Sequence, residues 1–276
     1  MAYGVLFDGT RCIGCRACSV ACKSWNENSA KVEKKTSVEG GIQGKAVVSS
    51  DTFTFMRYRE IGEGDDFKWA FAKIQCMHCL KPGCETACIV GALHRNKETG
   101  AVTYDQGKCI GCRYCMVACP FGIPTYQWED RTPWIRKCTF CSDRLNEAEN
   151  GMAPACVTAC PTRALQFGER DELIEEAHKR IEESKAADPA GVGKYIDHVY
   201  GEKEVGGTAW MYISSVDMTE LDLPWLSEEP VTKNARTAMS LLPYYATGML
   251  ALMVGIYFIT KRRQKIAAGK HEEKKG

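Results

Sequence analysis

The sequence predicts an α+β fold that ends in one transmembrane helix, and three observations support this prediction. The chain of 276 residues contains 16 cysteines, which fall into four groups of four. Short apolar or β-branched segments lie beside these groups, as expected of small strands next to binding loops. Near the C-terminus, residues 238–260 contain no charged side chain. The three observations indicate, in turn, metal chemistry, small sheets and a membrane.

The overall composition excludes some other classes of protein. The net charge is +1 and the sequence pI is about 7.4, so the chain has no strong field for nucleic acid, and we expect no nucleic-acid partner. Disulfide scaffolds are usually short secreted chains. Residues 1–12 contain no basic start, no apolar run and no twin arginine, so we expect no export signal on this chain.

The cysteines form four quartets that leave none over. They are Cys12, Cys15, Cys18 and Cys22; Cys76, Cys79, Cys84 and Cys88; Cys109, Cys112, Cys115 and Cys119; and Cys138, Cys141, Cys156 and Cys160. The third quartet is spaced C-x2-C-x2-C-x3-C and is followed by Pro120, as in bacterial ferredoxins that bind 4Fe–4S clusters. Four such clusters need as many thiolates as the chain contains. The sequence therefore predicts four 4Fe–4S clusters, with all 16 cysteines as iron ligands.

Zinc is the main alternative, because C-x2-C pairs also build zinc ribbons. The x2-x2-x3 spacing of the first and third quartets fits a single tetrahedral ion poorly. His78 lies inside the second quartet and could be a zinc ligand there. That quartet already has four sulfurs, so we expect His78 to pack or to form hydrogen bonds instead.

The spacing also predicts which quartets share clusters. In two-cluster ferredoxins the fourth cysteine of a run ligates the other cluster. Twenty residues separate Cys88 from Cys109, which suits the two halves of one compact module. Quartets two and three are therefore predicted to pair, and quartets one and four to pair around them, giving two nested ferredoxin-like 4Fe–4S modules. The predicted ligands are Cys12, Cys15, Cys18 and Cys160 for cluster 1; Cys76, Cys79, Cys84 and Cys119 for cluster 2; Cys88, Cys109, Cys112 and Cys115 for cluster 3; and Cys22, Cys138, Cys141 and Cys156 for cluster 4.

The predicted domains follow from this pairing. Residues 1–170 form the four-cluster domain, with an inner module at about 70–125 and an outer module from 1–30 and 130–170. The rest of the chain is predicted to comprise a helix and extended segment at 171–235, a transmembrane helix at 236–261 and a basic tail at 262–276.

Local patterns predict the supporting elements. Strands are expected at residues 2–7, 52–58, 101–104 and 165–167, and a loop at 31–45. Residues 171–187 have apolar residues at helical spacing, with Asp171 as the expected N-cap. Glu175–Lys179 and Glu176–Arg180 are expected ion pairs on this helix, and Leu173, Ile174, Ala177 and Ile181 are its expected buried face.

Several other residues near the quartets have two possible roles. Four basic residues lie within or beside the ligand runs: Arg16, Lys108, Arg113 and Lys137. Cations near a cluster raise its reduction potential, but surface lysines and arginines are often simply solvated. Trp128 and Trp134 are expected to be core or interface aromatics rather than electron relays.

Residues 238–260 are predicted to cross a membrane. As a helix these 23 residues span roughly 35 Å, more than a hydrocarbon core of ~30 Å. Pro243 is expected near the first turn, where proline is tolerated. Tyr244 and Tyr245 at one end, and Tyr257 and Phe258 at the other, suit the membrane interfaces.

The flanking charges predict an orientation. Four basic residues follow the apolar segment: Lys261, Arg262, Arg263 and Lys265. The positive-inside rule therefore predicts a cytoplasmic tail and an extracytoplasmic cluster domain. Export with a signal-bearing partner would reconcile this orientation with the missing signal. The alternative is a cytoplasmic cluster domain that breaks the charge rule.

Three features carry a resemblance to a known family: the four quartets, the runs at residues 76–79 and 109–115, and the insertion inside the fourth quartet. In these features the chain resembles the iron–sulfur subunits of the dimethyl-sulfoxide-reductase superfamily. The subunits with a C-terminal anchor are more similar, namely the β subunit of membrane-bound formate dehydrogenase and the electron-transfer subunit of membrane-bound nickel–iron hydrogenase. Residues 200–208 and 221–224 look more like the hydrogenase subunit. The missing leader favours the formate-dehydrogenase-like arrangement. Lys23 and Ile89 stand where such runs often have proline.

The resemblance implies an electron-transfer subunit with no catalytic residue of its own. It would relay single electrons through four 4Fe–4S clusters, from or to a catalytic subunit of molybdopterin or nickel–iron type. Its other partners would be membrane lipid and an integral-membrane subunit that is quinone-reactive or cytochrome b-like. Two alternatives stay open: a polyferredoxin-like redox partner, and a subunit that contributes directly to quinone or substrate reduction.

Overall fold

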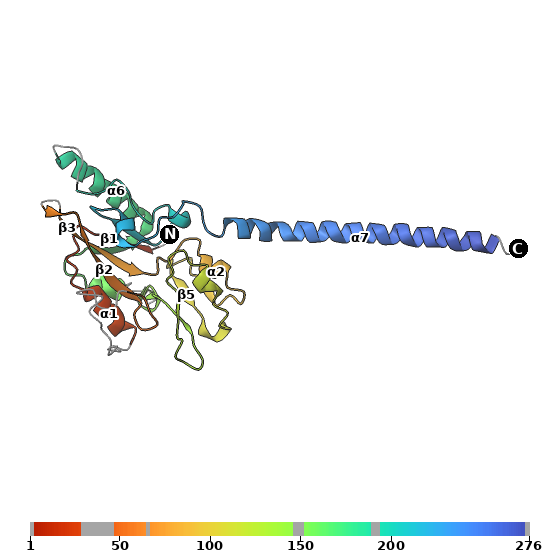
Figure 1. Cartoon of the computed structure of the whole chain (residues 1–276), viewed down its shortest axis with the longest axis horizontal. Coiled ribbons are helices and arrows are strands. Elements are labelled where there is room, and N and C mark those ends of the chain that lie inside the picture. Colours follow the sequence, from red (N-terminus) through yellow and green to blue (C-terminus); the bar gives the residue numbers. More distant parts are fainter. Residues whose placement is uncertain (1–2, 29–46, 65–66, 146–151, 189–193, 274–276) are drawn as a thin grey trace. The chain divides into compact units, whose positions relative to one another are not determined.

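The structure is a computed structural model that describes residues 3–28, 47–64, 67–145, 152–188 and 194–273. The chain divides into two compact units, Met1–Val231 and Thr232–Gly276, and Figure 1 shows its course. The predicted loop at residues 31–45 lies outside the described residues.

A three-stranded sheet joins distant parts of the first unit. Its strands are β1 (Tyr3–Asp8), β8 (Leu165–Glu169) and β9 (Trp210–Ile213), in the order β8-β1-β9. Strand β1 lies in the centre, antiparallel to β8 and parallel to β9. The predicted strands at residues 2–7 and 165–167 are thus confirmed.

Both faces of this sheet are buried. One face, which includes Leu6 and Ile213, packs against helix α6 (Arg170–Ala187) through Leu173 and Ile181. The other face contributes to the main core, which also contains several of the cysteines. Burying a side chain such as Leu or Ile contributes about 1.5–3 kcal/mol, so α6 holds the sheet firmly.

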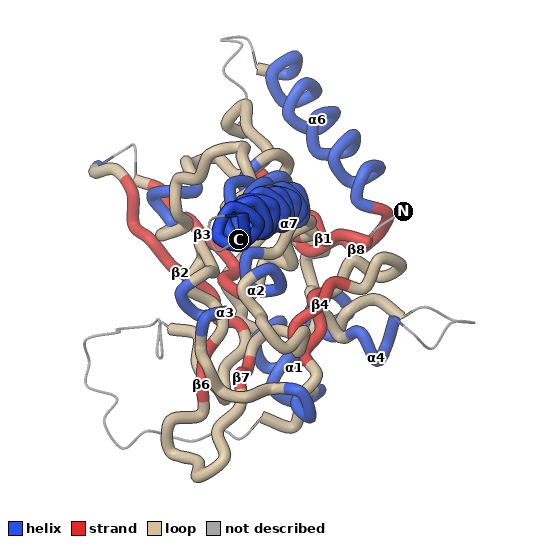
Figure 2. Tube along the Cα trace, turned by 90° about the vertical axis from the view of Figure 1, so that its right-hand side faces the viewer, coloured by secondary structure: helices blue, strands red, loops and turns tan. Residues whose placement is uncertain are grey.

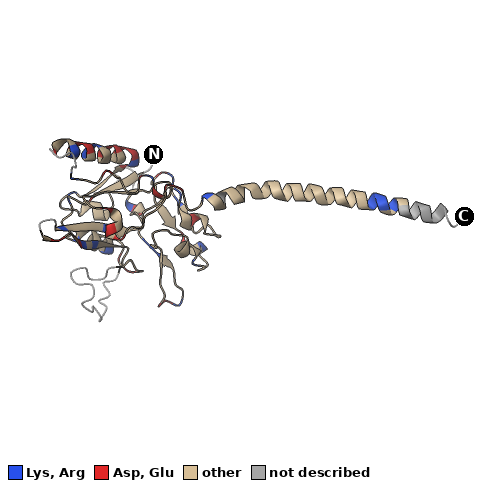
Figure 3. Cartoon of the chain, turned by 45° about the horizontal axis from the view of Figure 1, so that its top comes forward, with Lys and Arg blue, Asp and Glu red and all other residues tan. Residues whose placement is uncertain are grey.

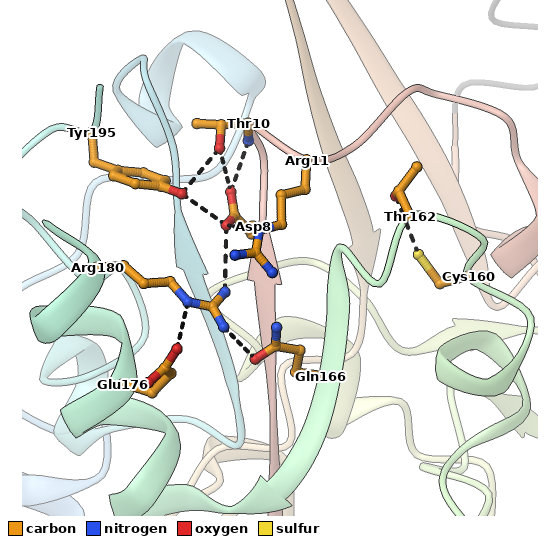
Figure 4. Close-up of polar contacts among 9 residues, drawn as sticks. All are labelled: Asp8, Thr10, Arg11, Cys160, Thr162, Gln166, Glu176, Arg180 and Tyr195. Carbon is orange, nitrogen blue, oxygen red and sulfur yellow. Dashed lines mark hydrogen bonds and ion pairs between the residues drawn. The ribbon is translucent and has the colours of Figure 1, made fainter. Parts of the chain in front are cut away.

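A buried carboxylate at the end of β1 connects the sheet with α6 (Figure 4). Asp8 is 1% exposed and accepts hydrogen bonds from the backbone N–H and hydroxyl of Thr10, at 3.0 and 2.7 Å, and from the hydroxyl of Tyr195, at 2.9 Å. It forms ion pairs with Arg11 at 3.3 Å and Arg180 at 3.4 Å. The network fixes the start of the loop that carries the first quartet.

The hairpin of β2 (Thr54–Ile61) and β3 (Lys68–Gln75) covers that loop from the other side. Met56 of β2 lies opposite Lys73 of β3, and the Met56 sulfur is 3.6 Å from the Cys18 sulfur. The strand predicted at residues 52–58 is present but begins two residues later and ends three residues later.

The remaining elements of the first unit are mostly short (Figure 2). Two small hairpins pair β4 (Leu93–Arg95) with β5 (Val102–Tyr104), as predicted for β5, and β6 (Thr125–Tyr126) with β7 (Ile135–Arg136). The helices are α1 (Ala17–Trp25), α2 (Gly83–Thr86), α3 (Tyr114–Val117), α4 (Ser142–Leu145) and α5 (Ala155–Thr158), with 3-10 turns η3 (Gln106–Lys108), η4 (Glu204–Gly206) and η5 (Met218–Leu221).

The predicted helix at residues 171–187 is confirmed as α6, but the predicted N-cap, Asp171, is wrong. The helix starts at Arg170 and its N-cap is Glu169, which makes no side-chain cap hydrogen bond. Asp171 therefore lies in the first turn, where a carboxylate still interacts favourably with the helix dipole. The Glu176–Arg180 pair is present at 2.8 Å, whereas Lys179 lies 3.9 Å from Glu183. Figure 3 shows both signs of charge along α6.

The second unit consists mainly of α7 (Lys233–Glu273). The segment Lys233–Ile266 contains an 18-residue window with a mean hydropathy of 1.5, and it is long and apolar enough to cross a membrane. Figure 3 shows a long uncharged stretch followed by basic residues. Pro243 lies inside the helix, so the prediction of a first-turn proline was wrong, because the helix begins ten residues earlier. The proline removes one backbone hydrogen bond there.

Candidate iron–sulfur cluster sites

In three of the four cysteine loops, the backbone N–H two residues after the first cysteine donates to its sulfur at 3.4 Å; the pairs are Gly14–Cys12, Gly111–Cys109 and Phe140–Cys138. The donor residues have φ values of 66°, 73° and 59°. In the fourth loop, His78 has the same position after Cys76 and also a left-handed φ, of 47°. Such φ values cost a glycine little, and they turn the amide toward the sulfur. An N–H aimed at a thiolate stabilises its charge, as in known cluster sites.

The third cysteine of each quartet lies on a short helix, and these helices pack in pairs. Helix α1 of the first quartet packs against α5 of the fourth, and α2 of the second packs against α3 of the third. The structure therefore places quartets one and four side by side, and likewise quartets two and three.

Three cysteines of quartet one meet the last cysteine of quartet four. Burial raises the pKa of Cys12 to about 12, against the hydrogen bond from Gly14, and the nearby thiols of Cys18, Cys160 and Cys15 add to the increase. A small cavity of about 20 Å³ is lined by these four cysteines together with other core residues.

Quartets two and three exchange their last cysteines. The pKa of Cys79 is raised well above its ordinary value by burial and then by Cys76, Cys119 and Cys84. Burial raises the pKa of Cys115 to about 11, with further contributions from Cys109, Cys112 and Cys88. The fourth cysteine of each quartet thus lies with three cysteines of the other.

The last set combines Cys22 with three cysteines of quartet four. Burial raises the pKa of Cys22 to about 12; Lys73 opposes this shift, while Cys156 and Cys141 add to it. The pKa of Cys138 is raised by burial and then by Cys22. These groupings coincide with the predicted ligand sets, and the ligand assignment itself stays a prediction.

The sites fit a 4Fe–4S cluster by the chemistry of their donors. Each set offers four thiols; of the sixteen, eight are buried, seven are half-buried and one, Cys15, is exposed. Three loops also aim an N–H at a sulfur. In the part of the chain that the structure describes, no three His, Cys, Asp or Glu side chains are placed to hold a single metal ion. Thiols with raised pKa values need a positive partner to ionise, and bound iron supplies that charge.

The four predicted basic residues divide into two kinds. Lys137 is 5% exposed, and its ammonium donates to the carbonyls of Val102 and, at 3.1 Å, Cys138. The other three lie nearer the surface: Arg16 donates to the Tyr58 hydroxyl at 2.9 Å, Arg113 lies over the Tyr126 and Trp128 rings, and Lys108 pairs with Asp105 at 3.0 Å. Only Lys137 of the four is a buried cation.

The prediction for His78 is confirmed. Of the two roles predicted for Trp128, core or interface, the core of this chain is excluded and the interface role stays a prediction. His78 is fully buried; its Nδ1 accepts a hydrogen bond from the N–H of Val102 at 2.9 Å, and its ring lies 4.8 Å from that of Phe140. Burial, with Lys137 nearby, lowers the pKa of His78 well below its ordinary value, so the ring is neutral. Trp128 is 62% exposed and Trp134 is 37% exposed, because they lie in the connection of a hairpin whose strands have two residues each.

Lys73 was not predicted as a site residue. It is 1% exposed in β3, three residues before Cys76, and its nearest charged groups are thiols. A lysine within the apolar segment Trp-Ala-Phe-Ala-Lys-Ile, so close to a ligand run, was the available signal. No strand was predicted at residues 68–75.

The segment before β9 is joined to the second quartet by backbone hydrogen bonds. The N–H of Leu80 donates to Gly207 O at 2.9 Å, and that of Ala209 donates to Met77 O at 3.1 Å. Arg170 of α6 holds the same segment through the carbonyls of Thr208, at 2.8 Å, and Glu202, at 2.7 Å. The segment thus fixes the second quartet relative to the sheet.

Helices α2 and α3, which contribute to the predicted cluster 2 site from quartets two and three, approach each other closely through their backbones. A Cβ added at Gly83 would lie 2.5 Å from the carbonyl oxygen of Ala118, beside Cys84 and Cys119. Gly83→Ala must separate α2 from α3, and we expect a loss of about 1–3 kcal/mol of stability. The thermal midpoint of cluster bleaching should fall accordingly. Gly107→Ala is the control, because its Cβ would meet the nearest atom at 3.4 Å. Equal midpoints for the two variants would contradict the close approach.

A histidine–carboxylate pair should make stability depend on pH. Nε2 of His198 lies 2.8 Å from Glu204, a buried residue that also accepts from the Gly201 N–H at 2.7 Å. The hydrogen bond to Glu204 raises the pKa of His198, against partial burial. Burial raises the pKa of Glu204, but the hydrogen bonds from His198 and backbone amides outweigh it and the net pKa is lowered.

The pair contributes most to stability at pH values between the ordinary pKa values of its members, which are 4.5 for Glu204 and 6.5 for His198. The histidine contribution is lost as pH rises through its raised pKa, and the carboxylate contribution as pH falls through its lowered pKa. His198 is half exposed, so His198→Gln should cost at most about 1 kcal/mol in this window and less on either side. Thermal midpoints of both proteins from pH 4 to 9 test this. A difference that is constant with pH would contradict it.

Buried thiols on paired ferredoxin-like loops define an iron–sulfur electron-transfer protein, and residues 67–170 match the family model of the 4Fe-4S dicluster domain. The chain belongs to the family of iron–sulfur electron-transfer subunits represented by HybA and the formate dehydrogenase iron–sulfur subunits. Its cofactor is therefore the 4Fe–4S cluster.

Three relatives document this membership. A protein of Nitratidesulfovibrio vulgaris is 43% identical over 99% of this chain and 70% of its own length. The hydrogenase-2 operon protein HybA of Escherichia coli O157:H7 is 34% identical, over 96% of this chain and 85% of its own. The iron–sulfur subunit of the nitrate-inducible formate dehydrogenase of Escherichia coli K12 is 36% identical, over 92% and 82% respectively.

Proposed function

We propose that this chain holds four 4Fe–4S clusters in a row and relays single electrons between a catalytic subunit and a quinone-reactive membrane subunit. The observation that carries the proposal is the grouping of 16 cysteines into four sets that adjoin one another. When bound, such clusters accept and donate one electron at a time without bond chemistry. The protein supplies the spacing, the exclusion of water and the local charges.

The order of the sets can be inferred from the cysteines that lie between them. Cys18 of cluster 1 interacts with Cys156 of cluster 4. In the same way, Cys138 of cluster 4 interacts with Cys76 of cluster 2, and Cys84 of cluster 2 with Cys115 of cluster 3. The proposed order is therefore cluster 1, cluster 4, cluster 2, cluster 3. Clusters 1 and 3 are its ends, and their loops contain the exposed Cys15 and the half-buried Cys112.

The proposed module layout follows the same pairs. Residues 1–30 and 130–170 form the outer module and residues 70–125 the inner one. The packing of α1 on α5 and of α2 on α3 supports this nesting. No part of the chain is proposed to be catalytic.

The proposed partners come from the names of the relatives. These name a hydrogenase operon and formate dehydrogenase, so the catalytic partner is a nickel–iron hydrogenase subunit or a molybdopterin-containing formate dehydrogenase subunit. Helix α7 anchors the chain beside an integral-membrane subunit, with the tail after Thr260 in the cytoplasm and the cluster domain outside.

Purification of the native complex tests the relay. We expect about sixteen iron atoms per chain, a co-purifying catalytic subunit and a membrane subunit. The isolated chain should exchange electrons with dyes but show no formate, hydrogen or quinone turnover. Iron well below this count would overturn the four clusters, and turnover by the isolated chain would favour the alternative of a direct catalytic role.

Protease accessibility tests the orientation. In intact spheroplasts, added protease should cut the cluster domain and spare the tail after Thr260. Protection of the cluster domain until the membrane is opened would show that it is cytoplasmic.

A further inference from the structure

Lys73 is a buried cation without a carboxylate partner in the part of the chain that the structure describes. Its side chain is 1% exposed, and its ammonium lies 3.1 Å from Oε1 of Gln75 and 4.3 Å from the centre of the Trp210 ring. Removing an ammonium from water costs several kcal/mol unless opposite charge compensates it. An amide oxygen and a ring face supply only part of that compensation.

The surroundings of Lys73 are the sulfurs of two predicted clusters. Lys73 lies opposite Met56 in the β2–β3 hairpin, and opposite residues of antiparallel strands project from the same face. The Met56 sulfur lies 3.6 Å from that of Cys18. Trp210, under the ammonium, belongs to the same core as Cys18 and Cys156.

The electrostatics of Lys73 agree with this placement. Burial alone lowers its pKa, but nearby thiolates reverse the effect and the net pKa is raised. The contributors, in order, are Cys156, Cys18, Cys138 and Cys22. One of these belongs to the cluster 1 set and three belong to the cluster 4 set.

We propose that Lys73 is a shared counter-charge that raises the reduction potentials of clusters 1 and 4. The inference rests on the proposed four-cluster function and assigns a residue that sets potentials within it. A cluster with four thiolates is anionic and gains one more negative charge on reduction, so a nearby cation favours the reduced form. Because Lys73 is buried, solvent and salt screen its charge little.

Lys137 provides an internal comparison. It is the other buried lysine near the cysteines in the described residues, and its charge acts on Cys84 of the cluster 2 set. Lys73 thus acts on thiols of the cluster 1 and cluster 4 sets, and Lys137 acts on a thiol of the cluster 2 set.

Redox titration of the purified, cluster-loaded complex, followed by electron paramagnetic resonance, tests the proposal. In Lys73→Met, which removes the charge and keeps an unbranched side chain, we expect the midpoint potentials of clusters 1 and 4 to fall and those of clusters 2 and 3 to stay. Lys73→Arg should restore both potentials toward wild type. Lys68→Met, an exposed lysine on the same strand, is the matched control and should shift none.

Gln75→Glu keeps the test decisive if Lys73→Met loses iron. This nearly isosteric change puts a carboxylate 3.1 Å from the ammonium and cancels its charge without deleting it. The same two potentials should fall. Four unchanged potentials with full iron content, or an equal shift of all four, would overturn the role of Lys73. A wild-type complex with fewer than four clusters would instead overturn the proposed function.

Discussion

Replacement of Cys119 by alanine is expected to abolish the cluster held by Cys76, Cys79 and Cys84, although Cys119 belongs by sequence to the third quartet. The thiol of Cys119 is half-buried and interacts with Cys76. The other three cysteines of the third quartet take Cys88 as their predicted fourth ligand, and Cys88 interacts with Cys115. Losing one of four ligands should remove one cluster, about four of sixteen iron atoms per chain.

Two reference variants show which cluster is lost. Cys79→Ala removes a ligand of cluster 2, and Cys112→Ala removes a ligand of cluster 3, whether or not the fourth cysteines cross over. The electron paramagnetic resonance spectrum of reduced Cys119→Ala should match that of Cys79→Ala. A match with Cys112→Ala would show that each quartet binds its own cluster and would contradict the proposed ligand sets.

Replacement of Asp8 by alanine should destabilise the first unit strongly. It would leave Arg180, which is 10% exposed, without its buried ion-pair partner and would remove the acceptor for Tyr195 and Thr10. Breaking a buried pair from one side costs about 3–5 kcal/mol. In a chain of this size that corresponds to a fall of roughly 10 °C in thermal midpoint. Cluster bleaching during heating provides the measurement.

Glu176→Gln is the matched control for Asp8→Ala. Glu176 binds the same arginine at 2.8 Å but is 40% exposed, so its loss should cost at most about 1 kcal/mol. Both changes act on one network (Figure 4), and only the burial of the carboxylate differs. Similar midpoints for the two variants would show that Asp8 is not the centre of the network.

The sequence predicted the cofactor well because ligand spacing is a local property. The run from Cys109 to Pro120 encodes its own turn, and Gly111 and Arg113 adopt the left-handed φ values that the turn requires. The strands at residues 2–7 and 165–167 were visible in their apolar runs. Their pairing with each other was not predicted, because no pattern within either strand names its neighbour.

The wrong and missing predictions concern residues whose position depends on tertiary contacts. Asp171 had the side chain of a cap, but the helix begins one residue earlier. Trp128 is apolar enough for a core, yet it is largely exposed and lies under Arg113. Lys73 is buried near sulfurs from four separate positions in the chain, and lysine is rarely expected inside a protein. Only the folded chain brings those sulfurs together.

The central position of β1 also determines when the first unit can be completed during synthesis. Val5 pairs with Phe167 on one side and with Trp210 on the other. Strand β1 therefore waits until nearly the whole unit has been synthesised before both of its edges are covered. Residues 76–119, by contrast, can close on themselves early, because their contacts are close in sequence. The cluster sites should close in the same order, so that the sites of the first quartet are among the last to be enclosed.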